Sequence, residues 1–162
     1  TGLNVADVDL SALAEEVGAG LADMEPERRV ELHIEPGMHV RGDRALLLTL
    51  LDNLMGNAWK FSRNAAVARV EVGTETDADG HPIHFVRDNG AGFDPNYVDK
   101  LFRPFQRLHS QDEFQGHGIG LASVKRIIER HGGQIGAIGA PGQGAKFWFR
   151  LGDPLEPADE TG

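Results

Sequence analysis

Residues 43–62, with the sequence DRALLLTLLDNLMGNAWKFS, are the stretch that decides the fold of this chain. Asp43 is a typical N-cap residue, and the pattern after it predicts a long helix that runs to about Ser62. The apolar side chains of this helix share one arc, so we expect that arc to be buried. They are Leu47, Leu50, Leu51, Leu54, Ala58 and Phe61.

A polar stripe runs along the edge of this apolar arc. Asn53, Asn57 and Lys60 lie within about 60° of one another when each residue turns the helix by about 100°. An amide oxygen in such a stripe can ligate Mg²⁺, and a lysine one turn further on can contact phosphate oxygens. Considered alone, the stripe is also typical of a solvated helix face.

Further along the chain, a carboxylate and two glycines follow a predicted strand. Residues 83–88 have the pattern of a strand, and the sequence Asp88-Asn89-Gly90-Ala91-Gly92 comes at its end. A carboxylate there can accept a hydrogen bond from the amino group of adenine, and the glycines let the backbone approach a flat base. A glycine-rich turn explains the same residues when they are considered alone.

A second glycine-rich motif, Gly116-His117-Gly118-Ile119-Gly120-Leu121, opens a predicted helix. Free N–H groups at a helix start, together with glycine backbone, can cradle a phosphate. The motif is neither a dinucleotide fingerprint nor a Walker A loop, because its spacing differs and no Gly-Lys-Ser/Thr occurs. Alone it also fits a flexible hinge. In this order, however, the three pieces together predict a nucleotide site.

The remaining pattern predicts the fold class as α+β, a two-layer α/β sandwich in which three helices cover one mixed sheet of about five strands. The expected helices are residues 8–24, 43–62 and 120–131, and the expected strands are residues 29–34, 38–41, 66–76, 83–88, 134–140 and 145–151. One or two short helical turns are expected within residues 95–105, and a mobile loop follows. We expect one domain over residues 1–152 and an acidic, disordered tail over residues 153–162.

Composition excludes several classes of function. The net charge of −9 argues against a nucleic-acid or anionic-membrane binder. The absence of cysteine excludes disulfides, zinc-thiolate sites and cysteine nucleophiles. No signal peptide and no apolar run long enough to span a membrane is visible, so we expect a cytoplasmic domain without direct membrane insertion. The chain begins with Thr1 rather than Met, which fits a fragment of a longer protein that is soluble or membrane-anchored.

With its motifs in this order, the chain resembles the catalytic ATP-binding domain of bacterial sensor histidine kinases, in the superfamily shared with gyrase-type and mismatch-repair ATPases. The resemblance covers residues 8–151 and implies the Bergerat-type ATP-binding fold. Residues 53–61 resemble the N box, 88–92 the G1 box, 102–105 the F box and 116–121 the G2 box. Residues 105–110, followed by Gly-x-Gly-Ile-Gly-Leu, are most similar to phytochrome-type and related light- or PAS-sensing kinases.

The resemblance implies a role for each residue of the long helix that matches the N box. Asn57 would ligate Mg²⁺, and Asn53 would support the region where the metal meets the phosphates. Lys60 would contact phosphate, and Phe61 would pack beside the adenine. Asn53, Asn57 and Lys60 are therefore the implied catalytic residues, with ATP and Mg²⁺ as the implied cofactors.

The resemblance also implies the other wall of the site. Asp88 would accept from the adenine amino group, and Gly90 and Gly92 would make room for the base. A lid over residues 96–117 would close on the phosphates, anchored by Phe102 and Phe105. The implied contacts of the lid and of the helix after it are Arg107, Gly116, His117, Gly118, Ile119, Gly120 and Leu121.

Two positions refine this interpretation. Hydrolytic members of the superfamily carry a glutamate where this chain has Asn53, and an amide is a poor base, which favours phosphoryl transfer to a protein over hydrolysis. His117 stands where many relatives have threonine or a small residue, so its titration could tune lid closure, or it could be an ordinary surface residue.

The acceptor is expected outside this chain. None of the seven histidines lies in the His-acid-x-x-Thr/Asn-Pro context of a phosphoacceptor, so we expect that histidine before Thr1, in the dimerisation domain of the same kinase. The receiver domain of a response regulator would be the next partner, and no nucleic acid is expected. Two alternatives remain open: a nucleotide-sensing binding module without chemistry, and an anti-sigma-type protein Ser/Thr kinase.

Overall fold

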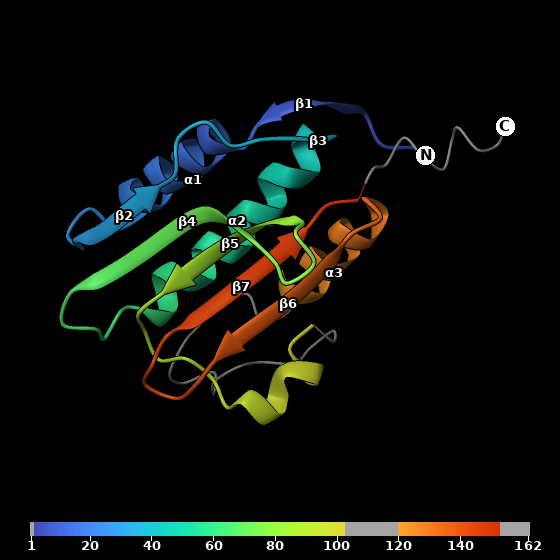
Figure 1. Ribbon diagram of the computed structural model, residues 1–162. Helices are drawn as coiled ribbons and strands as arrows, with labels where there is room; N and C mark the ends of the chain where they lie inside the picture. Colours follow the sequence, from blue (N-terminus) through green and yellow to red (C-terminus); the bar gives the residue numbers. More distant parts are fainter. Residues whose placement is uncertain (1, 103–119, 153–162) are drawn as a thin grey trace, which may run out of the picture.

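In the computed structural model of the chain, three helices cover one face of a five-stranded sheet (Figure 1). The structure describes residues 2–102 and 120–152. The helices are α1 (Leu10–Met24), α2 (Arg44–Phe61) and α3 (Gly120–Arg130), with a 3-10 helix, η1 (Pro95–Lys100). The strands are β1 (Val5–Asp9), β2 (Val30–Ile34), β3 (His39–Asp43), β4 (Ala68–Thr76), β5 (Pro82–Asp88), β6 (Gln134–Gly139) and β7 (Ala145–Arg150).

The large sheet has the strand order β2-β4-β5-β7-β6. Strands β2 and β4 run parallel, whereas the other neighbours are antiparallel, so the sheet is mixed. The register places Val86 between Val72 on β4 and Phe147 on β7, and these apolar side chains face the helices. The predicted fold class, with its three helices and five-stranded mixed sheet, is confirmed.

Strands β1 and β3 form a small second sheet, and the two strands lead directly into α1 and α2. Strand β1 pairs with β3 in an antiparallel ladder that joins Val8 to Val40. The sequence predicted the region of β3 but missed β1, because the short alternation before Leu10 gives little signal and its partner lies more than 30 residues away. Strand β1 also ends at the residue that caps α1, because the Asp9 carboxylate accepts the N–H of Ala12 at 2.9 Å.

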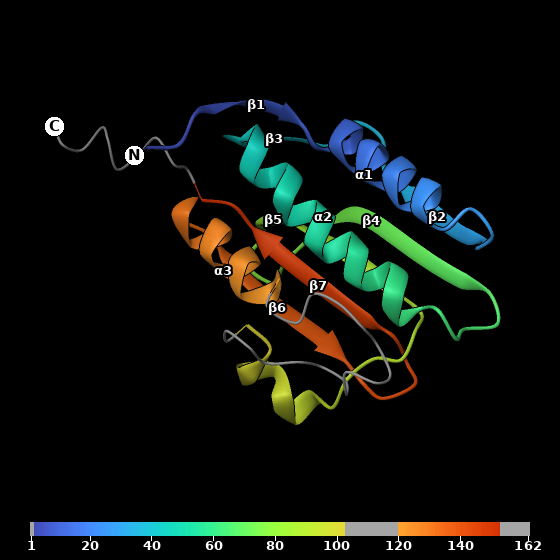
Figure 2. The ribbon, with the colours of Figure 1, turned by 180° about the vertical axis from the view of Figure 1, so that it is seen from behind.

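Helix α2 lies between α1 and α3, as the view from behind shows (Figure 2). The prediction of Asp43 as its N-cap is confirmed, because the Asp43 carboxylate accepts the N–H of Leu46 at 3.1 Å. The predicted apolar arc is buried, with Leu47, Leu50 and Leu51 fully inaccessible to solvent. Helix α2 is therefore the centre of the core, and its polar stripe is held in place by that burial.

His131, just after α3, ties this helix to the start of α2. Its ring is fully buried, and its Nε2 accepts the backbone N–H of Asp43 at 3.1 Å. Nδ1 lies 2.8 Å from the carbonyl oxygen of Ile127. Because Nε2 must accept, the ring proton is on Nδ1 and is donated to that carbonyl. One buried imidazole thus fixes two helices that lie far apart in the sequence.

Several predictions fall partly or wholly outside the described residues. The predicted helical turns after Pro95 are confirmed as η1, whereas residues 103–119 and the predicted tail over residues 153–162 are not described. Leu101 and the half-buried Phe102 close the described part of the proposed lid. Within residues 2–102 and 120–152, every helix is too short or too polar to cross a membrane.

Candidate functional site

The last two turns of α2 carry the polar residues that the sequence singled out. Asn57 is 6% exposed, while Asn53 and Lys60 are half-buried. Asn57 therefore lies at the edge of the core, on the same stripe of α2 as these two neighbours. An amide in this position offers an oxygen that can ligate a metal ion.

Phe61 ends α2 and is 8% exposed. Its backbone carbonyl lies at the C-terminal end of the helix, where carbonyl groups lack partners within the helix. The N–H of Ala91 donates to this carbonyl at 2.9 Å. This hydrogen bond joins the end of α2 to the loop after β5, which are 30 residues apart in the sequence.

Asp88 is the last residue of β5 and directly precedes the loop that bonds to Phe61. Its side chain is 5% exposed, and burial raises the pKa of this carboxyl from 3.8 to about 7. A hydrogen bond of 2.8 Å from the N–H of Gly90 to Oδ1 opposes this rise without cancelling it. A buried carboxyl with a strongly shifted pKa in such a position is typical of a functional site.

Gly90 is required by the close approach of the loop to α2. A Cβ atom at this position would lie 2.0 Å from the carbonyl oxygen of Phe61, which real side chains do not permit. Gly92 has a φ of +69°, in the left-handed region that glycine tolerates best. The glycines of the loop therefore allow the backbone to pack against α2 and then turn away.

The turn between β6 and β7 supports the loop from its other side. Gly142 donates its N–H to the carbonyl of Ala91 at 2.7 Å, and Gly144 donates to Gly90 at 3.0 Å. Asn89 is exposed but braces the loop against the start of β4, since its side chain bonds to the N–H of Arg69 and the carbonyl of Val67. Sequence reasoning gave no role to Asn89, although an Asp-Asn-Gly sequence favours such turn contacts.

The described start of the proposed lid packs on the sheet. Phe102 contacts Phe147 edge-on, with ring centroids 6.2 Å apart, and Phe93 lies 6.1 Å from the same ring. Gly120 begins α3, and the side chain of Leu121 is buried in the core at 3% exposure. Leu121 can therefore reach a ligand only through its backbone. Arg107, Gly116, His117, Gly118 and Ile119 lie outside the described residues.

The residues on α2 fit a hard divalent cation. Mg²⁺ takes oxygen ligands, and the side-chain amides of Asn53 and Asn57 each offer one from successive turns of α2. A different cluster, made of Asp77, Asp79 and His81, lies in the turn between β4 and β5. There the Asp77 carboxylate already accepts the N–H groups of Asp79 and His81, which explains the cluster as a turn.

Two surface hollows lie away from these residues. One of about 330 Å³ separates α1 from α2, and its lining includes Leu21, Met24 and Leu48. The other, of about 300 Å³, lies between α3 and β6 beside Trp148. The lining of neither hollow includes Asn57 or Asp88.

Comparison with known proteins identifies what this arrangement is similar to. A family model described as "Histidine kinase-, DNA gyrase B-, and HSP90-like ATPase" matches residues 42–155. Phytochrome-like protein Cph1 from Synechocystis is 33% identical over 143 residues, which make up 88% of this chain and 19% of that protein. The chain thus spans about a fifth of the length of this relative.

Solved structures give the same fold. The full-length structure of ShkA in complex with AMPPNP has a TM-score of 0.76 and 29% identity, over 95% of this chain and 32% of that one. The mycobacterial sensor histidine kinase MprB has a TM-score of 0.73 and 25% identity, over 91% of this chain and 96% of that one. Both similarities cover more than nine-tenths of this chain.

Proposed function

This chain belongs to the family of histidine kinase-, DNA gyrase B- and HSP90-like ATPases, and from this premise we propose its function. It is the ATP-binding catalytic domain of a sensor histidine kinase, and it donates the γ-phosphoryl group of ATP to a histidine on a separate dimerisation domain. One observation carries the proposal. The buried carboxyl of Asp88 is held, through Gly90 and Ala91, against the turn of α2 that bears Asn57 and Phe61.

In this proposal, Asp88 recognises the adenine base. Its carboxylate accepts the amino group of adenine, and because Asp88 is buried, this hydrogen bond discriminates against bases that lack the donor. Phe61 provides an apolar surface beside the base, and the glycine at position 90 keeps that surface clear of side chains. Gly92 redirects the loop toward the start of the lid.

The phosphates lie along the polar stripe of α2. Asn57, supported by Asn53, would hold Mg²⁺, which neutralises phosphate charge when it is bound. Lys60 contributes a positive charge one turn further on, where it contacts phosphate oxygens. We also propose that residues 96–117 form a lid, and that Arg107 and the backbone from Gly116 to Leu121 complete the phosphate contacts.

The chemistry is an in-line displacement at the γ-phosphorus. The bond to the oxygen that bridges the β- and γ-phosphates breaks, a bond to a ring nitrogen of the acceptor histidine forms, and ADP leaves with the electron pair. The chain supplies position and charge rather than a base. Asn53 stands one turn before Asn57, and because its amide cannot take a proton from water, hydrolysis is not assisted there.

The partners follow from this role. The acceptor histidine belongs to a dimerisation domain of the same kinase, and a response regulator takes the phosphoryl group from that histidine. The mycobacterial sensor histidine kinase MprB supports this assignment, because the chain resembles 96% of its solved structure. The similarity to Cph1 favours a light- or PAS-sensing parent kinase.

Transfer of radiolabelled phosphate from [γ-³²P]ATP to a supplied dimerisation hairpin tests the proposal. We expect label on the hairpin that is lost in acid and kept in base, because phosphohistidine has this stability. A hairpin with its histidine replaced by alanine is the control and should stay unlabelled. Acid-stable label would indicate a serine kinase instead. Normal ATP binding with no label on any hairpin of the matching kinase would contradict the phosphoryl-donor function.

A further inference from the structure

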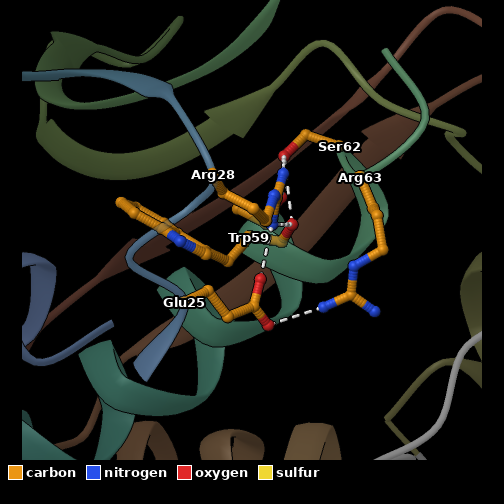
Figure 3. A network of polar contacts seen from close by, with 6 residues as sticks. Glu25, Arg28, Trp59, Ser62 and Arg63 are labelled. Carbon is orange, nitrogen blue, oxygen red and sulfur yellow. Dashed lines mark hydrogen bonds and ion pairs between the residues drawn. The ribbon is translucent and has the colours of Figure 1, made fainter. Parts of the chain in front are cut away.

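A network of polar contacts joins the segment after α1 to the end of α2 (Figure 3). Arg28 lies at its centre, and its guanidinium is mostly buried, with 17% of the side chain exposed. Nη1 donates to the backbone carbonyl of Trp59 at 2.5 Å, and Nη2 donates to the hydroxyl of Ser62 at 3.4 Å. Arg28 therefore contacts the last turn of α2 through two separate donors.

The carboxylate of Glu25 orients this guanidinium. One of its oxygens lies 3.4 Å from Nη1 of Arg28, and the other lies 2.7 Å from Nη2 of Arg63 (Figure 3). Glu25 thus bridges two arginines, Arg28 before β2 and Arg63 just after α2. The network places positive charge beside the carbonyl end of the helix, where the helix dipole favours it.

Ser62 carries the contact further into the helix. Its side chain is fully buried, and its hydroxyl donates to the carbonyl of Ala58 at 2.7 Å while lying 3.2 Å from the carbonyl of Trp59. Arg28 and Ser62 together supply side-chain donors to the carbonyl of Trp59, and the Ser62 hydroxyl adds a second donor to the carbonyl of Ala58. This fixes the path of the backbone between residues 58 and 62.

The same turn forms one wall of the candidate nucleotide site. Phe61, between the two residues that Arg28 contacts, accepts the N–H of Ala91 through its carbonyl at 2.9 Å. A small rotation of this turn would move the Phe61 ring and would also displace the loop whose Gly90 N–H bonds to Asp88. Arg28 itself lies outside residues 42–155, the part that the family model matches.

We propose that Arg28 is a positioning residue for nucleotide binding. It holds the last turn of α2 through Trp59 and Ser62, so that Phe61 and the loop bonded to it keep the shape that receives the base. The inference rests on the proposed ATP-binding function. Because the base is common to ATP and ADP, loss of Arg28 should weaken both nucleotides equally.

The test measures dissociation constants for Mg·AMPPNP and Mg·ADP by calorimetry, at a temperature where circular dichroism shows every variant to be folded. Arg28→Met keeps the length of the side chain but removes its charge and donors. Arg28→Lys keeps the charge but replaces the planar fork by a single ammonium group. Arg29→Met is the matched control, because Arg29 is the adjacent, exposed arginine.

A further control separates positioning from a general loss of stability. Val8→Ala removes buried volume from β1, far from the end of α2, so it should lower the unfolding temperature while leaving both dissociation constants unchanged. A purely structural role of Arg28 would give the same pattern as this control. A positioning role changes the dissociation constants of the folded protein.

We expect Arg28→Met to weaken both nucleotides by about tenfold, the effect of losing hydrogen bonds from a charged donor, and Arg28→Lys to lie between it and the wild type. Arg29→Met should match the wild type. Wild-type affinity in folded Arg28→Met, or a loss confined to AMPPNP, would overturn the inference. If Arg28→Met does not fold, wild-type affinity in Arg28→Lys has the same meaning. A wild-type chain that binds neither nucleotide would instead overturn the proposed function, and the inference with it.

Discussion

Replacing the Asp88 carboxyl by an amide, Asp88→Asn, should make the protein more stable at neutral and alkaline pH while removing its nucleotide affinity. Burial raises the pKa of Asp88 from 3.8 to about 7 in the folded protein. The folded state therefore binds this proton more tightly than the unfolded state does. Stability from this group is fully present below about pH 4 and is lost as the pH rises through about 7.

The magnitude follows from the shift. A difference of about three pKa units, at about 1.4 kcal/mol per unit, gives a loss of about 4 kcal/mol between pH 4 and pH 8. About 3 kcal/mol of this loss falls between pH 5 and pH 8. This is a large share of the ~5–15 kcal/mol by which domains of this size are usually stable. Asparagine keeps an oxygen that can accept the N–H of Gly90 but carries no charge to desolvate.

Urea unfolding of the wild type and of Asp88→Asn, at pH 5 and at pH 8, measures this effect. The free energy of unfolding of the variant minus that of the wild type should grow by about 3 kcal/mol between the two pH values. Asp52→Asn, which alters an exposed carboxyl on α2, should show little change. A difference for Asp88→Asn that is the same at both pH values would refute the reasoning.

The same carboxyl links nucleotide binding to pH. The ionised carboxyl accepts the adenine amino group more strongly than the protonated one does, so the affinity of the wild type for Mg·AMPPNP should fall, by up to about tenfold, from pH 8 to pH 6. Calorimetry at the two pH values measures this change. Constant affinity across this range would show that Asp88 does not contact the base as an anion.

Three further substitutions test other parts of the structure. Asn57→Asp adds negative charge beside the phosphates, so it should lower the affinity for Mg·AMPPNP, measured by calorimetry, by at least about tenfold. The circular dichroism spectrum should not change. Unchanged affinity would show that Asn57 does not contribute to the nucleotide site. The Cβ atom introduced by Gly90→Ala would lie 2.0 Å from the carbonyl oxygen of Phe61. This variant should therefore lower the free energy of unfolding, measured in urea, by about 2–3 kcal/mol. An unchanged free energy of unfolding would contradict this packing. His131→Phe leaves the N–H of Asp43 without its acceptor, so the same assay should show a loss of about 2 kcal/mol; full stability would mean that this hydrogen bond contributes nothing.

Local patterns explain why most of the fold could be predicted from the sequence. Asp43 has the chemistry of an N-cap, and the spacing of the leucines after it fixes both the length of α2 and its buried face. The strands β4 and β5, and likewise β6 and β7, are joined by glycine-containing turns, so their pairing is local. Strand β1 was missed because its pairing with β3 is not local and its own pattern is short.

The candidate site was predictable only in part, because a motif names residue types and not their surroundings. The sequence indicated Asp88 as a carboxylate at a strand end. Its desolvation, however, depends on how the loop after β5 packs against α2. Arg28 gave no signal at all, since two adjacent arginines follow Glu27 and only the folded chain distinguishes the one that bonds to α2 from its exposed neighbour.

The most direct test of the central claim is where an ATP analogue binds on this chain. Titration of ¹⁵N-labelled protein with Mg·AMPPNP, followed by the chemical shifts of assigned backbone amides, locates the ligand. The largest changes should fall on residues 57–61 at the end of α2 and on residues 88–92 after β5. Saturation that leaves both segments unchanged, or shifts centred on the hollow between α1 and α2, would contradict the assignment of the nucleotide site.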